Sequence, residues 1–153
     1  MSGDSSTSRV PLLERHQVTP EIASIYDALL AQRGVVPNMF KTLAHTPGLA
    51  LATAGYLKAL LSDGALPGYY KELVAVRLSV LNGSQYAIAA HSLSASQKGA
   101  TAEQIVAAKE NYESDALTDA QKLGLRCADK LHSSARDVDD AFFAQLKQHF
   151  SDP

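Results

Sequence analysis

Helix start and stop signals recur along nearly the whole chain, and they constrain its fold more than any other feature of the sequence. In residues 19–34, Thr19 is a helix-capping residue, Pro20 suits the first helical position and Gly34 suits the end. The apolar residues between these signals recur at helical spacing and predict an amphipathic helix with one buried face. These residues are Ile22, Ile25, Tyr26, Leu29 and Leu30.

The same kinds of signal continue through the next part of the chain. Residues 35–48 and 49–64 predict a short and a long helix, with Pro37 and Pro47 near their starts. Residues 68–81 form a run between glycines that is too long for a typical strand, so we predict a helix there as well.

Capping patterns predict two further helices in the second half of the chain. Thr101 and Thr118 each begin a Thr-x-x-Gln sequence, which is typical of a capping box at the start of a helix. The segment 137–150 predicts a last helix, whose apolar stripe needs a packing partner. That stripe consists of Phe142, Phe143, Leu146 and Phe150. With one more helix beginning at Ser84, the sequence predicts an all-α bundle of about seven helices.

Composition bounds the organisation of the chain and its partners. A chain of 153 residues with 46% hydrophobic content can bury one sizeable core, so we expect a single domain over residues 10–153. Residues 1–9 are polar and rich in serine, which is typical of a flexible tail. The net charge of −2 and scattered basic residues argue against a nucleic-acid or membrane partner. Without a membrane-length apolar run or a signal-peptide pattern, we expect a cytoplasmic location.

Cysteine and histidine usage limits redox and metal chemistry. Cys127 is the single cysteine, which excludes a disulfide within the chain. Because it shares a helical stripe with Leu123, Ala128 and Leu131, we expect a buried structural thiol. Four histidines show no metal-ligand spacing, so we expect neither a metal nor a cofactor. They are His16, His45, His132 and His149.

The segment LNGSQYAIAAHS, residues 81–92, contains the candidate functional residues. Its Asn-Gly pair predicts a tight turn between two helices, and Ser84 suits the N-cap of the second. Helical spacing places Ser84, Ala87 and His91 on one face, where we expect them to line a pocket. The turn would bring Glu72, one helix earlier, towards His91, and such a Glu–His pair predicts a proton relay.

These residues resemble the signature of the carboxymuconolactone decarboxylase and alkyl hydroperoxidase D superfamily. The redox signature of that family is a glutamate, eleven residues, and then Cys-x-x-Cys-x-x-x-His. Glu72 and His91 match its ends, and Tyr86 matches the pattern of the peroxidase-related branch. Ser84 and Ala87 stand where the family has its two cysteines.

The likeness extends beyond this signature. The segments VPNMFKTLAHTPGL, residues 36–49, and GALPGYYKELVAVR, residues 64–77, are also similar to the family, so the likeness covers roughly residues 10–150. It implies an alkyl hydroperoxidase D-like helical bundle that assembles as a homo-oligomer, a trimer or hexamer. Family members continue past the point where this chain stops, so the resemblance implies a short copy or a truncated sequence.

The missing sulfur atoms decide which activity the resemblance implies. In the redox branch, an antioxidant oxidoreductase, a thiolate attacks a hydroperoxide and a second thiol resolves the product. Ala87 offers no nucleophile at the attacking position and Ser84 cannot form a disulfide, whether the replacements are natural or engineered. We therefore expect thiol peroxidase activity to be lost or impaired.

Two alternative functions remain open at this point. The first is a cofactor-free acid–base enzyme of the decarboxylase type, in which Glu72 and His91 move protons and Arg77 steers the carboxylate of a lactone acid. The second is a non-catalytic binding or scaffold oligomer. Simpler interpretations also exist: Ser84 as a cap, Tyr86 as a packing residue, Glu72 as a solvated residue, and Arg77 as its ion-pair partner.

Overall fold

The computed structural model describes residues 8–152, and within that range the chain forms helices and no strand. Two of these helices are short 3-10 helices, η1 (Arg15–Gln17) and η2 (Ala135–Asp137). The α-helices of the described residues are α1 (Pro20–Arg33), α2 (Asn38–Leu43), α3 (Pro47–Leu61), α4 (Gly68–Leu81), α5 (Gln85–Gln97), α6 (Ala102–Glu110), α7 (Asp119–Ser133) and α8 (Asp140–His149). The all-α prediction is confirmed, with eight α-helices in the described part where about seven were expected.

The chain divides into two compact units, the first ending at Leu60 and the second beginning at Leu61. In the first unit, α1, α2 and α3 surround a small core built on Ile22, Tyr26 and Phe40. The buried Tyr26 hydroxyl donates hydrogen bonds to the backbone oxygens of Leu13 and Phe40, at 3.1 and 3.3 Å. These bonds tie the segment before α1 to α2.

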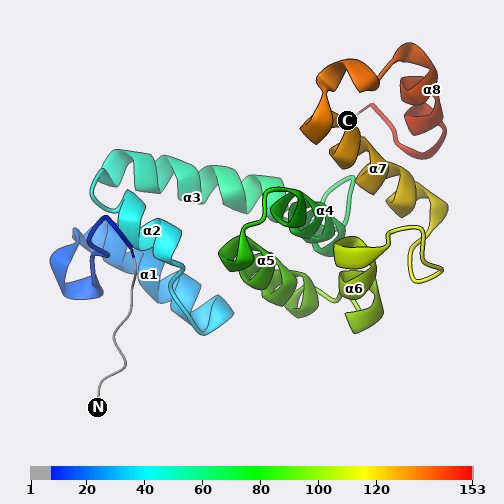
Figure 1. Ribbon diagram of the computed structural model, residues 1–153. Helices are drawn as coiled ribbons and strands as arrows, with labels where there is room; N and C mark the ends of the chain where they lie inside the picture. Colours follow the sequence, from blue (N-terminus) through cyan, green and yellow to red (C-terminus); the bar gives the residue numbers. More distant parts are fainter. Residues whose placement is uncertain (1–7, 153) are drawn as a thin grey trace. The chain divides into compact units, whose positions relative to one another are not determined.

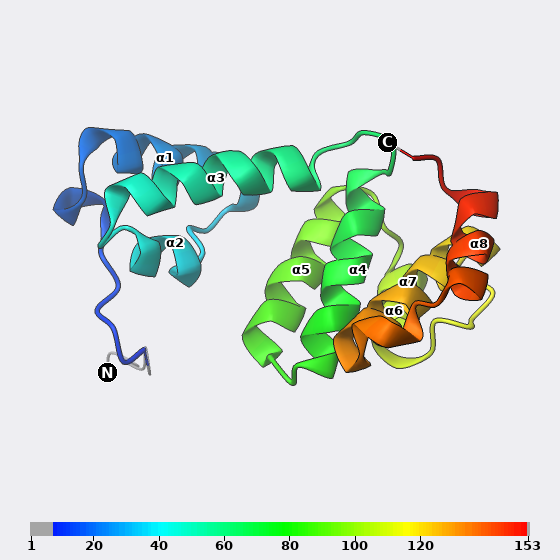
Figure 2. The same cartoon turned by 90° about the horizontal axis from the view of Figure 1, so that it is seen from above.

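The second unit is organised around α4, which packs against α5, α6 and α7 (Figure 1). Leu73, Val76 and Leu125 are fully buried in its core. Tyr70 adds a buried hydroxyl that donates to the backbone oxygen of Gln121 at 3.0 Å. Figure 2 shows α4 and α5 running side by side in this unit.

The helix ends follow the signals in the sequence. Thr19 precedes α1 as its N-cap, and Gly34 ends α1 in the left-handed conformation with φ of 72°. The capping boxes that begin at Thr101 and Thr118 are both present, so the predicted starts of α6 and α7 are confirmed.

The C-terminal aromatic stripe is largely covered by the chain itself. Phe142 is buried beneath Lys130, whose ammonium lies 4.9 Å from the ring centre. Phe150 packs on the core of the second unit, and Phe143 remains 54% exposed. Within the described residues, Phe143 is therefore the aromatic residue of the stripe that stays largely exposed.

Two predictions concern features that the structure describes only in part. Of the tail predicted at 1–9, residues 1–7 lie outside the described range. Within residues 8–152, no helix combines the length and apolar character that crossing a membrane requires.

Candidate functional site

The turn between α4 and α5 positions the candidate residues. Asn82 caps the C-terminus of α4, and Gly83 adopts a φ of 65°, a left-handed conformation that favours glycine. The amide of Ser84 donates to the backbone oxygen of Ser79 at 3.0 Å, and Ser84 then begins α5 as its N-cap. This turn places α5 beside α4, as the sequence predicts.

The carboxylate of Glu72 is the centre of the site. Glu72 is on α4 with 0% of its surface exposed, so the interpretation of this residue as solvated is wrong. Its oxygen Oε2 accepts a hydrogen bond from His91 Nδ1 at 2.8 Å. Its other oxygen, Oε1, accepts one from Ser94 at 2.7 Å and one from Lys98 Nζ at 2.6 Å. A buried carboxylate is thus satisfied by three donors from α5 and its C-cap.

These contacts determine the charge state of Glu72. Burial on its own would raise the pKa of this carboxyl group. Hydrogen bonds from His91, Lys98 and Ser94, together with the charge of Lys98, outweigh burial and hold the pKa at about 2. Glu72 is therefore an anion throughout the physiological pH range.

An ionised Glu72 fixes the tautomer of His91. An ionised carboxylate accepts hydrogen bonds and donates none, so Nδ1 of His91 carries the proton in the 2.8 Å bond. The other ring nitrogen, Nε2, forms no hydrogen bond to any of residues 8–152. The side chain is 32% exposed, which leaves it accessible to a small molecule. His91 is thus an oriented imidazole of the kind used for proton transfer.

The remaining predicted site residues lie nearer the start of α5. Ser84 Oγ accepts a hydrogen bond from the amide of Ala87 at 3.4 Å, which is the capping role. Ser84 is two helical turns from His91, about 10 Å along the axis, so its hydroxyl is beyond hydrogen-bond reach of the imidazole. Ala87 is one turn from His91 and partly buried. Tyr86 is 51% exposed and is therefore no core packing residue.

Sequence reasoning missed two members of the site, Ser94 and Lys98. They continue the spacing of Ser84, Ala87 and His91, with Ser94 one helical turn beyond His91 and Lys98 two turns beyond it. That spacing was the available signal. Lys98 adds a contact that spacing alone does not reveal, because its ammonium also donates to the backbone oxygen of Leu61 at 2.7 Å.

Arg77 is not the partner of Glu72. Its guanidinium forms a two-point ion pair with Asp129 on α7, with distances of 2.6 and 2.8 Å. The same group stacks on Tyr112, 5.0 Å from the ring centre. The interpretation of Arg77 as an ion-pair partner of Glu72 is therefore wrong, and Arg77 joins α4 to α7 instead.

Cys127 and the other histidines lie outside the site. Cys127 is partly buried on α7, and burial raises the pKa of its thiol, which disfavours the reactive thiolate. His45 Nε2 contacts the backbone oxygen of Pro11 and His132 Nε2 contacts Asn82 Oδ1, at 2.8 and 3.3 Å. Among residues 8–152 no three His, Cys, Asp or Glu side chains are arranged to hold a metal ion.

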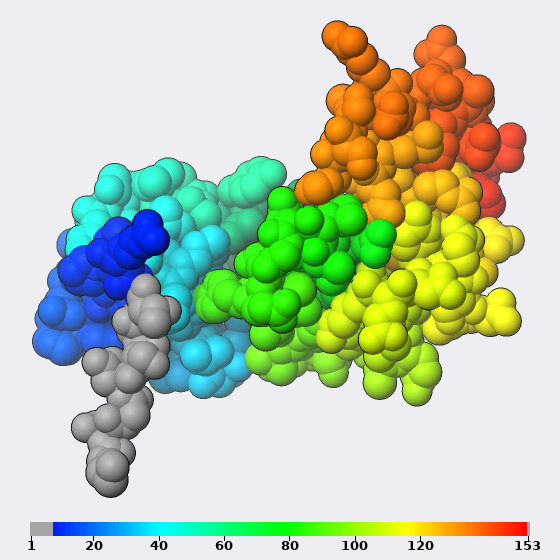
Figure 3. Space-filling view, viewed as in Figure 1, coloured from blue at the N-terminus to red at the C-terminus, as the bar shows by residue number. Residues whose placement is uncertain are grey.

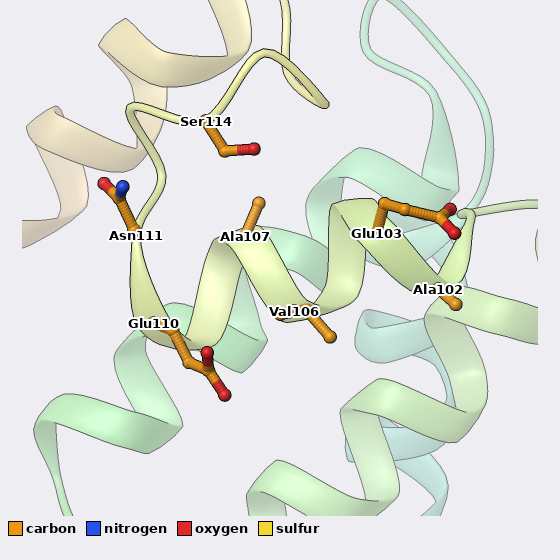
Figure 4. Close-up of a pocket in the computed structure, with 7 residues that line it drawn as sticks. All are labelled: Ala102, Glu103, Val106, Ala107, Glu110, Asn111 and Ser114. Atoms are coloured by element: carbon orange, nitrogen blue, oxygen red, sulfur yellow. The ribbon is translucent and has the colours of Figure 1, made fainter.

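A surface hollow of about 400 Å³ occurs elsewhere in the second unit. Figure 4 shows its seven lining residues on α6 and the loop that follows, from Ala102 to Ser114. None of them is a predicted site residue. Segments of α4 and α5, by contrast, reach the surface on the face seen in Figure 3, in agreement with the exposure of Tyr86 and Ala89.

Three solved structures are similar to this chain over nearly its whole length. A peroxidase-related protein from Ralstonia eutropha JMP134, described as an alkylhydroperoxidase AhpD core, is 29% identical with a TM-score of 0.83, covering 97% of this chain and 80% of that one. A cysteine-to-alanine variant of the debrominase Bmp8, in complex with 2,3,4-tribromopyrrole, is 25% identical with a TM-score of 0.81, covering 97% and 79%. A peroxidase-related protein from Silicibacter sp. TM1040 shares the fold, with 23% identity, a TM-score of 0.84 and coverage of 99% and 81%.

Family membership follows from the sequence match over the site. No curated protein matches the chain. Residues 47–130, more than half of the chain, match the carboxymuconolactone decarboxylase family, and this range includes Glu72, His91 and Lys98. The structural neighbours are alkyl hydroperoxidase D-like proteins of the same helical fold. The chain therefore belongs to the carboxymuconolactone decarboxylase family.

Proposed function

We propose that this chain is a peroxidase-related, alkyl hydroperoxidase D-like protein that has lost dithiol chemistry and kept the proton relay. The observation that carries the proposal is the cluster around Glu72. A fully buried carboxylate orients the imidazole of His91 while the ring stays partly exposed. The Nε2 atom of that ring, which forms no hydrogen bond to residues 8–152, is the atom available for proton transfer.

The positions of the missing sulfur atoms support the loss of peroxidase activity. Ala87 is the third residue of α5, where amide groups and the helix dipole stabilise an anion, and it is one turn from His91. A thiolate there would be well placed for attack, but a methyl group has no electron pair to donate. Ser84 is occupied as the helix cap and cannot be oxidised to a disulfide. Cys127 is on a different helix, with its pKa raised by burial.

Acid–base chemistry on a small molecule is the second candidate function. It is favoured by the fixed tautomer of His91, which leaves Nε2 as the atom that exchanges a proton with a bound substrate. The decarboxylase-type assignment of Arg77 is not part of this proposal, because Asp129 occupies the guanidinium. A lactone or enol acid would need another group to bind its carboxylate.

The proposal includes a homo-oligomer, a trimer or hexamer. The 54% exposure of Phe143 supports it, since a large apolar side chain in water favours association. Light scattering coupled to size exclusion gives the mass in solution. Replacement of Phe143 by Ser should lower that mass if this residue contributes, whereas a monomeric wild-type protein would contradict the proposal.

The decisive experiment restores the two sulfur atoms. Peroxide consumption with a dithiol reductant is compared between the wild type and the Ser84→Cys/Ala87→Cys variant, both in a Cys127→Ala background. The introduced thiolate at position 87 takes one oxygen of the hydroperoxide and releases an alcohol. The thiol at position 84 then displaces water to form the disulfide, which the dithiol reduces. We expect turnover only in the double variant, and a large loss of it on adding His91→Ala.

Two results would contradict this proposal. Robust dithiol-dependent turnover by the Cys127→Ala protein would show that the site did not lose its redox function. An inert double variant with an unchanged fold would show that more than the sulfur atoms is missing. For the acid–base candidate, Glu72→Gln and His91→Ala should abolish turnover of a lactone acid, while Arg77→Met should leave it measurable.

A further inference from the structure

Lys98 occupies an unusual position at the end of α5. It is the C-cap residue of that helix, and its ammonium lies between two oxygens, 2.6 Å from Glu72 Oε1 and 2.7 Å from the backbone oxygen of Leu61. Ser94 donates to the same oxygen of Glu72 at 2.7 Å. One oxygen of the carboxylate is thus held by two donors, and the other is presented to His91.

We infer that Lys98 is a positioning residue that holds Glu72 as a fixed anion, so that proton transfer in this site ends at His91 and does not continue to the carboxylate. This inference rests on the proposed function, because it specifies how the same relay works. It separates two mechanisms that a Glu–His pair alone would permit.

The geometry carries the argument. A proton on Oε1 would have to displace the ammonium of Lys98 or the hydroxyl of Ser94. A proton on Oε2 would require the His91 ring to accept a bond at Nδ1 that it now donates. Each oxygen is therefore closed to protonation while its donors stay in place. The low pKa of Glu72, about 2, agrees with this geometry.

Lys98 also offsets the charge that Glu72 presents to His91. A lone buried carboxylate beside an imidazole strongly favours the imidazolium form, and a neighbouring ammonium reduces that preference. Lys98 therefore offsets part of the negative charge that Glu72 places beside the ring. Without its charge, the full field of Glu72 would act on the ring.

The other charged side chains of α4 and α6 form no ion pair with Glu72 or His91 among the described residues. On α4, Lys71 donates to the backbone oxygen of Ser62 and Arg77 pairs with Asp129. On α6, three charged side chains form no ion pair with the cluster among the described residues. They are Glu103, Lys109 and Glu110. Among residues 8–152, Glu72 is the charged side chain bonded to His91, and Lys98 is the charged side chain bonded to Glu72.

Nuclear magnetic resonance of the His91 ring nitrogens tests the inference in the protein as it exists. Spectra are recorded from about pH 5 to about pH 9 for the wild type, Lys98→Met and Lys98→Arg. In Lys98→Met, the pH at which the ring gains its second proton should rise by about one unit, because the carboxylate is no longer offset. Lys98→Arg keeps the charge and should titrate like the wild type. His45, bonded to a backbone oxygen in the first unit, is the internal control and should not change.

The inference is overturned if His91 titrates at the same pH in Lys98→Met and the wild type while the amide spectra show an intact fold. A second measurement needs no variant. The carboxyl carbon of Glu72 should keep its ionised chemical shift from about pH 7 down to about pH 4. A change of that shift in step with the His91 ring would also overturn the inference. Neither outcome depends on peroxide turnover, so failure here is distinguishable from failure of the proposed function.

Discussion

Gly124 offers a sharp test of how α7 packs on α4. It is an interior residue of α7, where alanine normally stabilises a helix by about 1 kcal/mol relative to glycine. A Cβ built at this position would overlap the hydroxyl oxygen of Tyr70. That hydroxyl is buried and donates to the backbone oxygen of Gln121 at 3.0 Å. We therefore predict that Gly124→Ala destabilises the protein, against its helix propensity.

The expected loss of unfolding free energy follows from displacement of the Tyr70 hydroxyl. Displacing the hydroxyl leaves a buried donor unsatisfied, about 1 to 3 kcal/mol, and overpacking adds a similar amount. After subtracting the propensity gain of about 1 kcal/mol, the expected net loss of unfolding free energy is about 3 kcal/mol, within a range of about 1 to 5. Gly55→Ala is the matched control, because Gly55 is inside α3 with open space around its Cβ position. We expect Gly55→Ala to stabilise by about 0.5 to 1 kcal/mol.

Urea unfolding followed by circular dichroism gives these free energies. A double-mutant cycle identifies the cause: Tyr70→Phe removes the oxygen, and the nearest remaining atom to the Cβ is Cζ of Tyr70 at 3.1 Å. In the Tyr70→Phe background, the loss of unfolding free energy caused by Gly124→Ala should be smaller by at least about 1 kcal/mol. A Gly124→Ala protein as stable as the wild type, or an equal loss in both backgrounds, would refute the reasoning.

Two further predictions concern acid stability and helix caps. The pKa of Glu72 is lowered on folding from 4.5 to about 2, which contributes roughly 3 kcal/mol to the free energy of unfolding. This contribution is present above about pH 4.5 and is lost as the pH falls towards 2. In acid titrations, Glu72→Gln should therefore make the free energy of unfolding less dependent on pH over that range. Thr118→Ala removes the acceptor for the amide of Gln121 and should lower the free energy of unfolding by about 1 kcal/mol. Thr118→Ser keeps a hydroxyl acceptor and should retain most of that stabilisation. An equal loss of unfolding free energy in both variants would contradict the capping role.

Local signals predicted the helices well because their causes are local. The capping boxes at Thr101 and Thr118 act within one turn, so the residues that form each of them are three positions apart in the sequence. The Glu72–His91 contact was also predictable, since a tight turn brings two successive helices together. Spacing therefore accounts for the core of the candidate site.

Long side chains account for what sequence did not predict. Arg77 pairs with Asp129, which is 52 positions away, and no local pattern distinguishes that partner from Glu72. Lys98 reaches from the end of α5 to α4, and its destination depends on the packing of the two helices. Helical spacing shows which residues share a face of a helix, but it does not show which acceptor the charged group of a long, flexible side chain will bind.

The acidity of a thiol at position 87 tests the central claim most directly. Alkylation rates as a function of pH are compared for Ala87→Cys and for Ala89→Cys, an exposed control on the same helix, both with Cys127→Ala. If the site retains its proton relay, the thiol at 87 should titrate at least about one pH unit below the control, and adding His91→Ala should reduce the difference. Equal titration at the two positions would contradict the claim that this chain keeps a working relay without its sulfur atoms.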